Sequence, residues 1–195
     1  MLWVAVGAVA ASALWAGGVL LRGGGSKADL RGYRVRSDLC SSAQLSAFQA
    51  TYPDQDNAFH YTITTPSVET MYCQRGMRDI AALSTDAWVT VEVELHRESD
   101  PKAEFGDTWR SYARRGAVGT SYQVNAVSGI GDEAYLVVTM QNSSNEDMTL
   151  AVRDGWMTYR LDWSTLSLGT VVPPSVSEAS AWMRKATLAT LPKLK

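Results

Sequence analysis

The chain has 195 residues with 18 basic and 20 acidic side chains, so its formal net charge is only −2. No basic field is therefore present that would attract nucleic acid. Two cysteines are too few for a small disulfide-rich scaffold, and the length suits one soluble domain plus a short accessory segment.

An apolar run occupies residues 2–21, in which Ser12 is the only polar side chain. About twenty apolar residues are enough to cross the roughly 30 Å hydrocarbon core of a bilayer as a helix. The sequence therefore predicts a transmembrane anchor that holds the protein at the membrane. A cleaved signal peptide is the alternative, because small-residue triplets of the cleavable kind occur within the run.

Residues 22–36 are rich in glycine and charge and predict a flexible tether, and residues 37–195 predict one soluble domain. The basic residues after the apolar run favour a cytoplasmic position for this domain. The two cysteines favour the opposite side. Cys40 and Cys73 have the spacing of neither a redox pair nor a zinc site, and in an oxidising compartment they would close a loop of about 34 residues. We favour this disulfide and an extracytoplasmic domain, with two unpaired core thiols as the alternative.

The first predicted elements are a helix and three strands. The helix covers residues 38–50, where Asp38 or Ser41 caps the first turn and Leu45 and Phe48 share one face. The strands cover residues 59–64, 69–77 and 88–96, and the third shows the clearest alternation of apolar and polar side chains. A second helix begins near Pro101 and ends at Gly116.

The second half of the chain predicts a strand over residues 133–140 and a hairpin over 148–163. The hairpin turns at Asp154-Gly155, which is a strong signal between two alternating strands. The last helix begins after Ser175, which has the capping-box spacing with Glu178. Together these elements predict an α+β domain in which helices at both ends pack mainly on one face of an antiparallel sheet, preceded by the N-terminal transmembrane helix.

Four short motifs resemble a known family. They are a cysteine beside a capped first helix (Asp38-Leu39-Cys40), a cysteine in an early strand (Tyr72-Cys73), the turn and strand VSGIGDEAY at residues 127–135, and the closing LPKL at residues 191–194. The pattern resembles small actinobacterial cell-envelope lipoproteins of unknown function, which are similar to the PsbP-like α/β superfamily. The resemblance implies the fold and a disulfide but no activity. Because no cysteine follows the apolar run for lipidation, the anchor would be the helix itself.

The sequence contains no recognised catalytic, phosphate-binding or dinucleotide-binding motif. His60 and His96 are isolated from other metal-binding residue types, and His96 ends a polar strand face where a solvated imidazole is the simplest interpretation. We therefore predict neither an enzyme nor a bound metal or cofactor.

Tryptophans give the best indication of function. Trp88 and Trp156 fall on predicted strand faces whose other members are polar, and two such aromatics can bind a partner. The alternative is that a helix or loop covers them or that they pair across strands. With Glu92 and Arg160 they form the predicted interaction face. The leading hypothesis is a single-pass envelope protein whose outer domain binds another envelope protein or component.

The sequence leaves two other classes of function open. One is a carrier of a small apolar ligand, a lipid or glycan, in a cavity between sheet and helices lined by Trp109, Tyr159, Trp163 and Met183. The other is an enzyme, which would need a histidine within hydrogen-bond reach of a carboxylate in a cleft.

Overall fold

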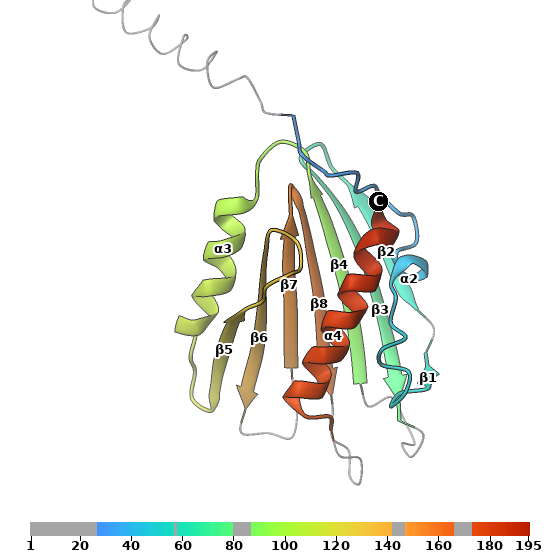
Figure 1. Cartoon of the computed structure of the whole chain (residues 1–195), viewed down its shortest axis with the longest axis vertical. Helices are drawn as coiled ribbons and strands as arrows, with labels where there is room; N and C mark the ends of the chain where they lie inside the picture. The colour runs from blue at the N-terminus through green and yellow to red at the C-terminus, as the bar shows by residue number, and fades with distance from the viewer. Residues whose placement is uncertain (1–26, 57, 80–86, 142–146, 166–172) are drawn as a thin grey trace, which may run out of the picture.

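The computed structural model describes residues 27–56, 58–79, 87–141, 147–165 and 173–195, and these form an α+β domain. Its strands form one antiparallel sheet in the order β1-β3-β4-β8-β7-β6-β5, and β2 also pairs with β3 (Figure 1). The strand bounds are β1 Asp54–Gln55, β2 Phe59–Thr64, β3 Val68–Arg78, β4 Ala87–His96, β5 Thr120–Ala126, β6 Glu133–Gln141, β7 Asp147–Asp154 and β8 Met157–Thr165. The predicted α+β class and antiparallel sheet are confirmed.

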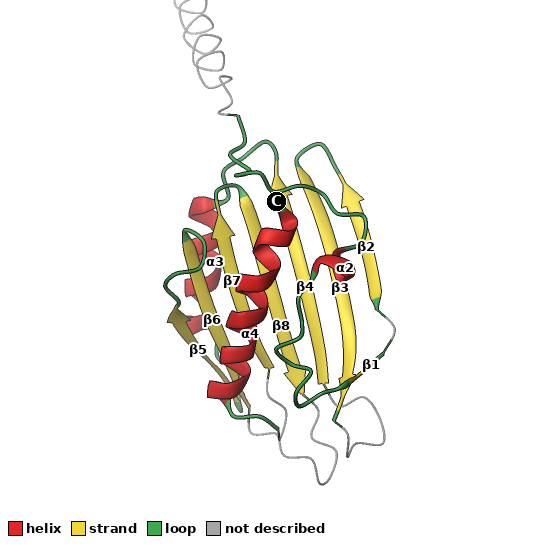
Figure 2. Cartoon of the chain, turned by 45° about the vertical axis from the view of Figure 1, so that its right-hand side comes forward, coloured by secondary structure: helices red, strands yellow, loops and turns green. Residues whose placement is uncertain are grey.

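The helices lie on both faces of this sheet. They are α2 (Leu39–Ser42), α3 (Lys102–Ser111), which a 3-10 turn η1 (Tyr112–Arg114) extends, and α4 (Val176–Thr190), which η2 (Leu191–Leu194) extends. Helices α2 and α4 cover one face, called here the α4 face, whereas α3 lies behind β5 and β6 on the other, called the α3 face (Figure 2). The prediction of helices mainly on one face is therefore wrong for α3.

The alternation of side chains in the central strands explains the two faces. In β4 every second residue, from Ala87 to Leu95, is buried against the α4 face, and the residues between them are partly exposed on the α3 face. β8 repeats the pattern, with Trp163 fully buried on the α4 face. A period of two in a strand has this consequence because successive side chains point to opposite sides.

The main core lies under α4. This helix begins at the predicted capping box, in which the Ser175 hydroxyl accepts a hydrogen bond from the Glu178 N–H and the Glu178 carboxylate accepts one from the Ser175 N–H. Its buried face packs on the sheet, where the Trp163 ring stacks on Phe48 at a centroid distance of 5.1 Å. Loss of such a fully buried aromatic side chain typically costs about 3–5 kcal/mol.

The first predicted helix is largely wrong. Only α2 is helical, with the Asp38 side chain accepting a hydrogen bond from the Ser41 N–H as expected. The backbone becomes extended at Ala43, and the Gln44 N–H donates to the Thr190 hydroxyl of α4 at 2.9 Å. Tertiary contacts thus replace the helical hydrogen bonds. The chain continues as turns at residues 46–51, and Phe48 in these turns is buried in the core.

The Cys40–Cys73 disulfide joins α2 to β3, as the sequence favoured. The bond links the N-terminal segment of the domain to an early strand of the sheet. By the chain-entropy model a loop of this size contributes roughly 3–4 kcal/mol to stability.

The chain is docked onto the sheet from Asp29 onwards. The Trp156 N–H donates to the Asp29 carbonyl at 2.8 Å, and the Arg31 guanidinium pairs with Asp132 at 2.6 Å and also with Asp154. The Tyr33 hydroxyl donates to Asp154 at 2.7 Å. Within the predicted tether of residues 22–36, the part from Asp29 onwards therefore contacts the domain.

No helix within the described ranges is long and apolar enough to cross a membrane. The predicted anchor at residues 2–21 lies outside the described residues.

Candidate functional site: a cleft beneath α3

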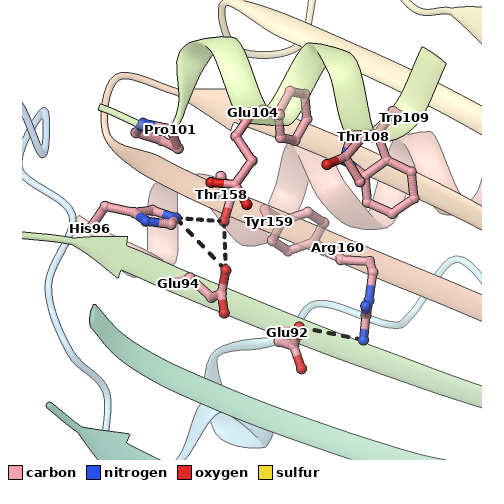
Figure 3. A pocket seen from close by; sticks show the side chains of 11 residues that line it. Glu92, Glu94, His96, Pro101, Glu104, Thr108, Trp109, Thr158, Tyr159 and Arg160 are labelled. Carbon is pink, nitrogen blue, oxygen red and sulfur yellow. Dashed lines mark hydrogen bonds and ion pairs between the residues drawn. The ribbon is translucent and has the colours of Figure 1, made fainter. Parts of the chain in front are cut away.

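A cleft of about 220 Å³ lies between α3 and the α3 face of β4 and β8 (Figure 3). Strands β4 and β8 form its floor and α3 forms one wall. The residues that line it are Glu92, Glu94, His96, Pro101, Glu104, Phe105, Thr108, Trp109, Thr158, Tyr159 and Arg160.

Antiparallel pairing brings the polar floor residues together. Glu92 is directly opposite Arg160, and their side chains form an ion pair of 3.4 Å. The Arg160 Nε also lies 2.9 Å from a carboxylate oxygen of Asp162. Directly opposite residues have their Cβ atoms about 4.5–5.5 Å apart, so this pair is built by the register itself.

A second polar group lies at the other end of the floor. The Thr158 hydroxyl is 3.4 Å from both the His96 Nε2 and the Glu94 carboxylate, and His96 lies 3.7 Å from that carboxylate (Figure 3). The His96 side chain is only 16% exposed, so the solvated imidazole expected from the sequence is wrong. The ring lines the cleft together with Pro101, which directly precedes α3.

The cleft carries excess negative charge. Glu92, Glu94 and Glu104 line it, and Arg160 is the one arginine or lysine among its lining residues. Burial raises the pKa of Glu92, and this effect outweighs the attraction of Arg160. Burial also raises the pKa of Asp162, although Arg160 and the Thr149 hydroxyl favour its ionised form. Desolvation therefore raises both pKa values at the floor of the cleft, and a bound cation would favour the ionised carboxylates.

Apolar side chains of α3 complete the site. The Phe105 ring packs on Tyr135 at 6.1 Å and anchors the helix to β6, while Trp109 borders the cleft and stacks on Tyr112 at 5.5 Å. An aromatic wall beside carboxylates suits a ligand that has both a positive charge and an apolar stem. Within the described part of the chain, no group of three or more His, Cys, Asp or Glu side chains is placed to hold a metal ion.

The predicted interaction face is only partly assembled. Glu92 and Arg160 meet in the cleft, but Trp88 lies further along β4, opposite Gly76, and is half-buried. Trp156 is 8% exposed and precedes β8. Its position follows from the hairpin register: Asp154 pairs with Met157, so the turn residues are Gly155 and Trp156. The four residues therefore do not form one surface.

The residues predicted to line a carrier cavity are also separated. Tyr159, Trp163 and Met183 pack in the core on the α4 face, whereas Trp109 lies on the α3 face. Sequence reasoning missed Glu94, Glu104 and Thr108 as site residues. The alternation Glu92-x-Glu94-x-His96 was a usable signal, but nothing in the sequence places α3 over it.

Comparison with known proteins adds no family, since no family model matches the chain and no curated protein resembles it in sequence. The resemblance to actinobacterial envelope lipoproteins stays a prediction.

Proposed function

We propose that this chain is a membrane-anchored, extracytoplasmic binding domain whose cleft receives a cationic side chain of another cell-envelope protein. The observation that carries the proposal is the excess of carboxylates beside Trp109 in a cleft of about 220 Å³.

The location rests on two features. The apolar run at residues 2–21 has the length of a membrane span, and the Cys40–Cys73 disulfide is of the kind that persists outside the reducing cytoplasm. These features outweigh the basic residues that follow the run.

The proposed anchor would hold the cleft close to the membrane. Asp29 is bonded to Trp156, and the Trp156 carbonyl accepts a hydrogen bond from the N–H of His96, a cleft residue, at 3.0 Å. Seven peptide units separate Arg22 from Asp29, which corresponds to a reach of at most about 25 Å. A membrane-proximal segment of a second membrane protein is the kind of partner that this arrangement favours.

The volume of the cleft argues for one side chain over a whole lipid or glycan. Pockets that hold drug-sized ligands typically measure about 300–1,000 Å³, and this cleft is smaller. Its charged floor is also unsuited to an acyl chain, because burying a carboxylate against hydrocarbon without a partner is costly. The carrier function is therefore the weaker proposal.

The proposal is tested with N-acetyl-arginine amide as the probe and N-acetyl-citrulline amide, its uncharged isostere, as the control. The full chain in detergent micelles is labelled with ¹⁵N-tryptophan, and the indole signals are followed during titration. We expect the Trp109 indole signal to shift with the arginine probe alone, and this shift to disappear in a Glu94→Gln/Glu104→Gln variant with unchanged folding. Equal shifts with both probes, or no shift of Trp109, would contradict a cationic site.

A further inference from the structure

Strand β2 presents an exposed apolar row at the edge of the sheet. Phe59, Tyr61 and Ile63 are 59%, 36% and 52% exposed, and their alternation places them together on the α3 face. The Tyr61 ring stacks on Tyr72 of β3 at 4.7 Å, and Phe59 meets Tyr61 edge-on at 5.9 Å. The row is therefore ordered before any partner binds.

The opposite side of β2 is covered by the chain itself. The Thr62 hydroxyl donates to the Arg36 carbonyl at 3.1 Å, and the His60 Nδ1 lies 3.9 Å from Asp38. Within the described residues β2 pairs with β3 alone. One edge and one face of the strand thus remain available.

This edge has none of the usual protection against strand pairing. Natural edge strands carry lysine, other inward-pointing charges, proline or a bulge that blocks association. β2 has the sequence FHYTIT, with no lysine, arginine, acidic residue or proline, and its register with β3 continues without a bulge from Phe59 to Thr64. The exposed edge of β2 is therefore able to pair with a strand of another chain.

We propose that β2 pairs antiparallel with β2 of a second copy of this chain, centred on Tyr61. Directly opposite residues in a sheet share a face, and a two-fold axis at Tyr61 places Phe59 opposite the partner's Ile63. Tyr61 then lies beside the partner's Tyr61, and the apolar row runs unbroken across both copies. The uncharged, near-symmetric row fits another copy of itself better than a partner of opposite charge.

This inference is independent of the proposed function. The cleft lies over β4 and β8, the second and third strands inward from β2, or about 10–14 Å away at the spacing of neighbouring strands. Both clefts of the dimer would remain open. A single six-residue strand pair is smaller than the usual stable interface, so we expect dimers at tens of micromolar and monomers well below that.

Cysteine crosslinking tests the pairing and its register. Opposite Cα atoms are about 4.5–5.5 Å apart, within disulfide range, so Tyr61→Cys should form a covalent dimer of the full chain in detergent under mild oxidation. Ile63→Cys alone is the matched control, because the two copies of that position would be separated by four residues, or about 13 Å. Mixing Phe59→Cys with Ile63→Cys chains should restore crosslinking between the two variants while leaving Tyr61 intact.

The outcomes are distinct. A strong Tyr61→Cys dimer, a strong mixed dimer and at least tenfold less from Ile63→Cys alone would support the proposal. Equal crosslinking at all positions would show random collision and overturn it. Failure of both the Tyr61→Cys chain and the mixture to crosslink, with the unmodified chain sedimenting as a monomer at high concentration, would overturn it as well.

Discussion

Glu92 on β4 and Arg160 on β8 form a 3.4 Å ion pair on the floor of the cleft. Burial raises the pKa of Glu92 in spite of this partner, so the guanidinium offsets only part of the desolvation. Glu94 and Glu104 also line the cleft, and Arg160 is the one arginine or lysine among its lining residues, so the site keeps an excess of negative charge.

Replacing Arg160 with methionine removes the charge partner and keeps much of the side-chain volume. Glu92, 23% exposed in the pair, then loses the interaction that favours its ionised form, and its pKa rises further. We expect the free energy of unfolding to fall by about 1–2 kcal/mol at neutral pH. The loss should be smaller near pH 5, where more of Glu92 is protonated. Urea unfolding at both pH values measures this.

The control is the Glu92→Gln/Arg160→Met double variant, which removes both charges of the pair. It should recover the part of the lost stability that comes from unpaired Glu92, whereas the part that comes from Asp162, the other partner of Arg160, should remain. A loss that is the same at both pH values in the single variant would show that lost packing, and not charge, is responsible.

Binding of N-acetyl-arginine amide should weaken on acidification. The ionised carboxylates attract the probe, and protonation of Glu92 removes one of them. Because the pKa of Glu92 is above its ordinary value of 4.5, the decline in affinity should begin at a higher pH than for an ordinary glutamate. The same tryptophan titration at several pH values measures it. A Glu92→Gln variant should bind more weakly and lose this part of the pH dependence, whereas an unchanged profile would remove Glu92 from the site.

Removing the disulfide should destabilise the fold without changing it. A Cys40→Ala/Cys73→Ala variant frees the unfolded chain from a closed loop, and we expect a loss of roughly 3–4 kcal/mol in the free energy of unfolding. Urea unfolding of the oxidised, reduced and double-alanine proteins measures this. The reduced and double-alanine midpoints should lie close together and well below the oxidised one. Coincident midpoints for all three would show that the bond contributes nothing.

Gly155→Ala should release the docked N-terminal segment. Gly155 has φ of +63°, and an added Cβ would lie 2.3 Å from the Asp29 carbonyl oxygen, a backbone atom. The left-handed conformation alone costs about 1–2 kcal/mol with a side chain. We expect faster hydrogen exchange of the Trp156 and Tyr33 amides, which donate to the Asp29 and Leu30 carbonyls respectively. Gly116→Ala is the matched control, because a Cβ there meets nothing within 4 Å. Unchanged exchange at Tyr33 would show that the N-terminal segment is not released.

The sequence predicted the strands best where one face is apolar. The alternation in residues 88–96 gave β4 within one residue, because burial on one face leaves a clear period of two. β5 was missed for the opposite reason: Ser121, Gln123 and Asn125 are exposed, and no side chain of the strand is buried. A strand without a buried face carries little periodic signal.

The candidate site was harder to predict because it depends on long-range placement. Register alone brings Glu92 to Arg160, and both were expected on one polar face. The turn, however, falls at Gly155 and Trp156, one residue later than the Asp-Gly pair indicated, which removes Trp156 from the strand. The position of α3 beside β4 and β8 follows from its packing on Tyr135 of β6 and Ala151 of β7, which no local pattern encodes.

Crosslinking in intact cells tests the central claim most directly. A photoreactive amino acid at Thr108, an exposed cleft residue on α3, is compared with one at Leu188, which is exposed on α4. We predict one discrete crosslinked protein from position 108, absent from position 188, lost with Glu94→Gln/Glu104→Gln, and degraded by protease added outside the cytoplasmic membrane. The same products from both positions, or a product that added protease reaches only after lysis, would contradict the account.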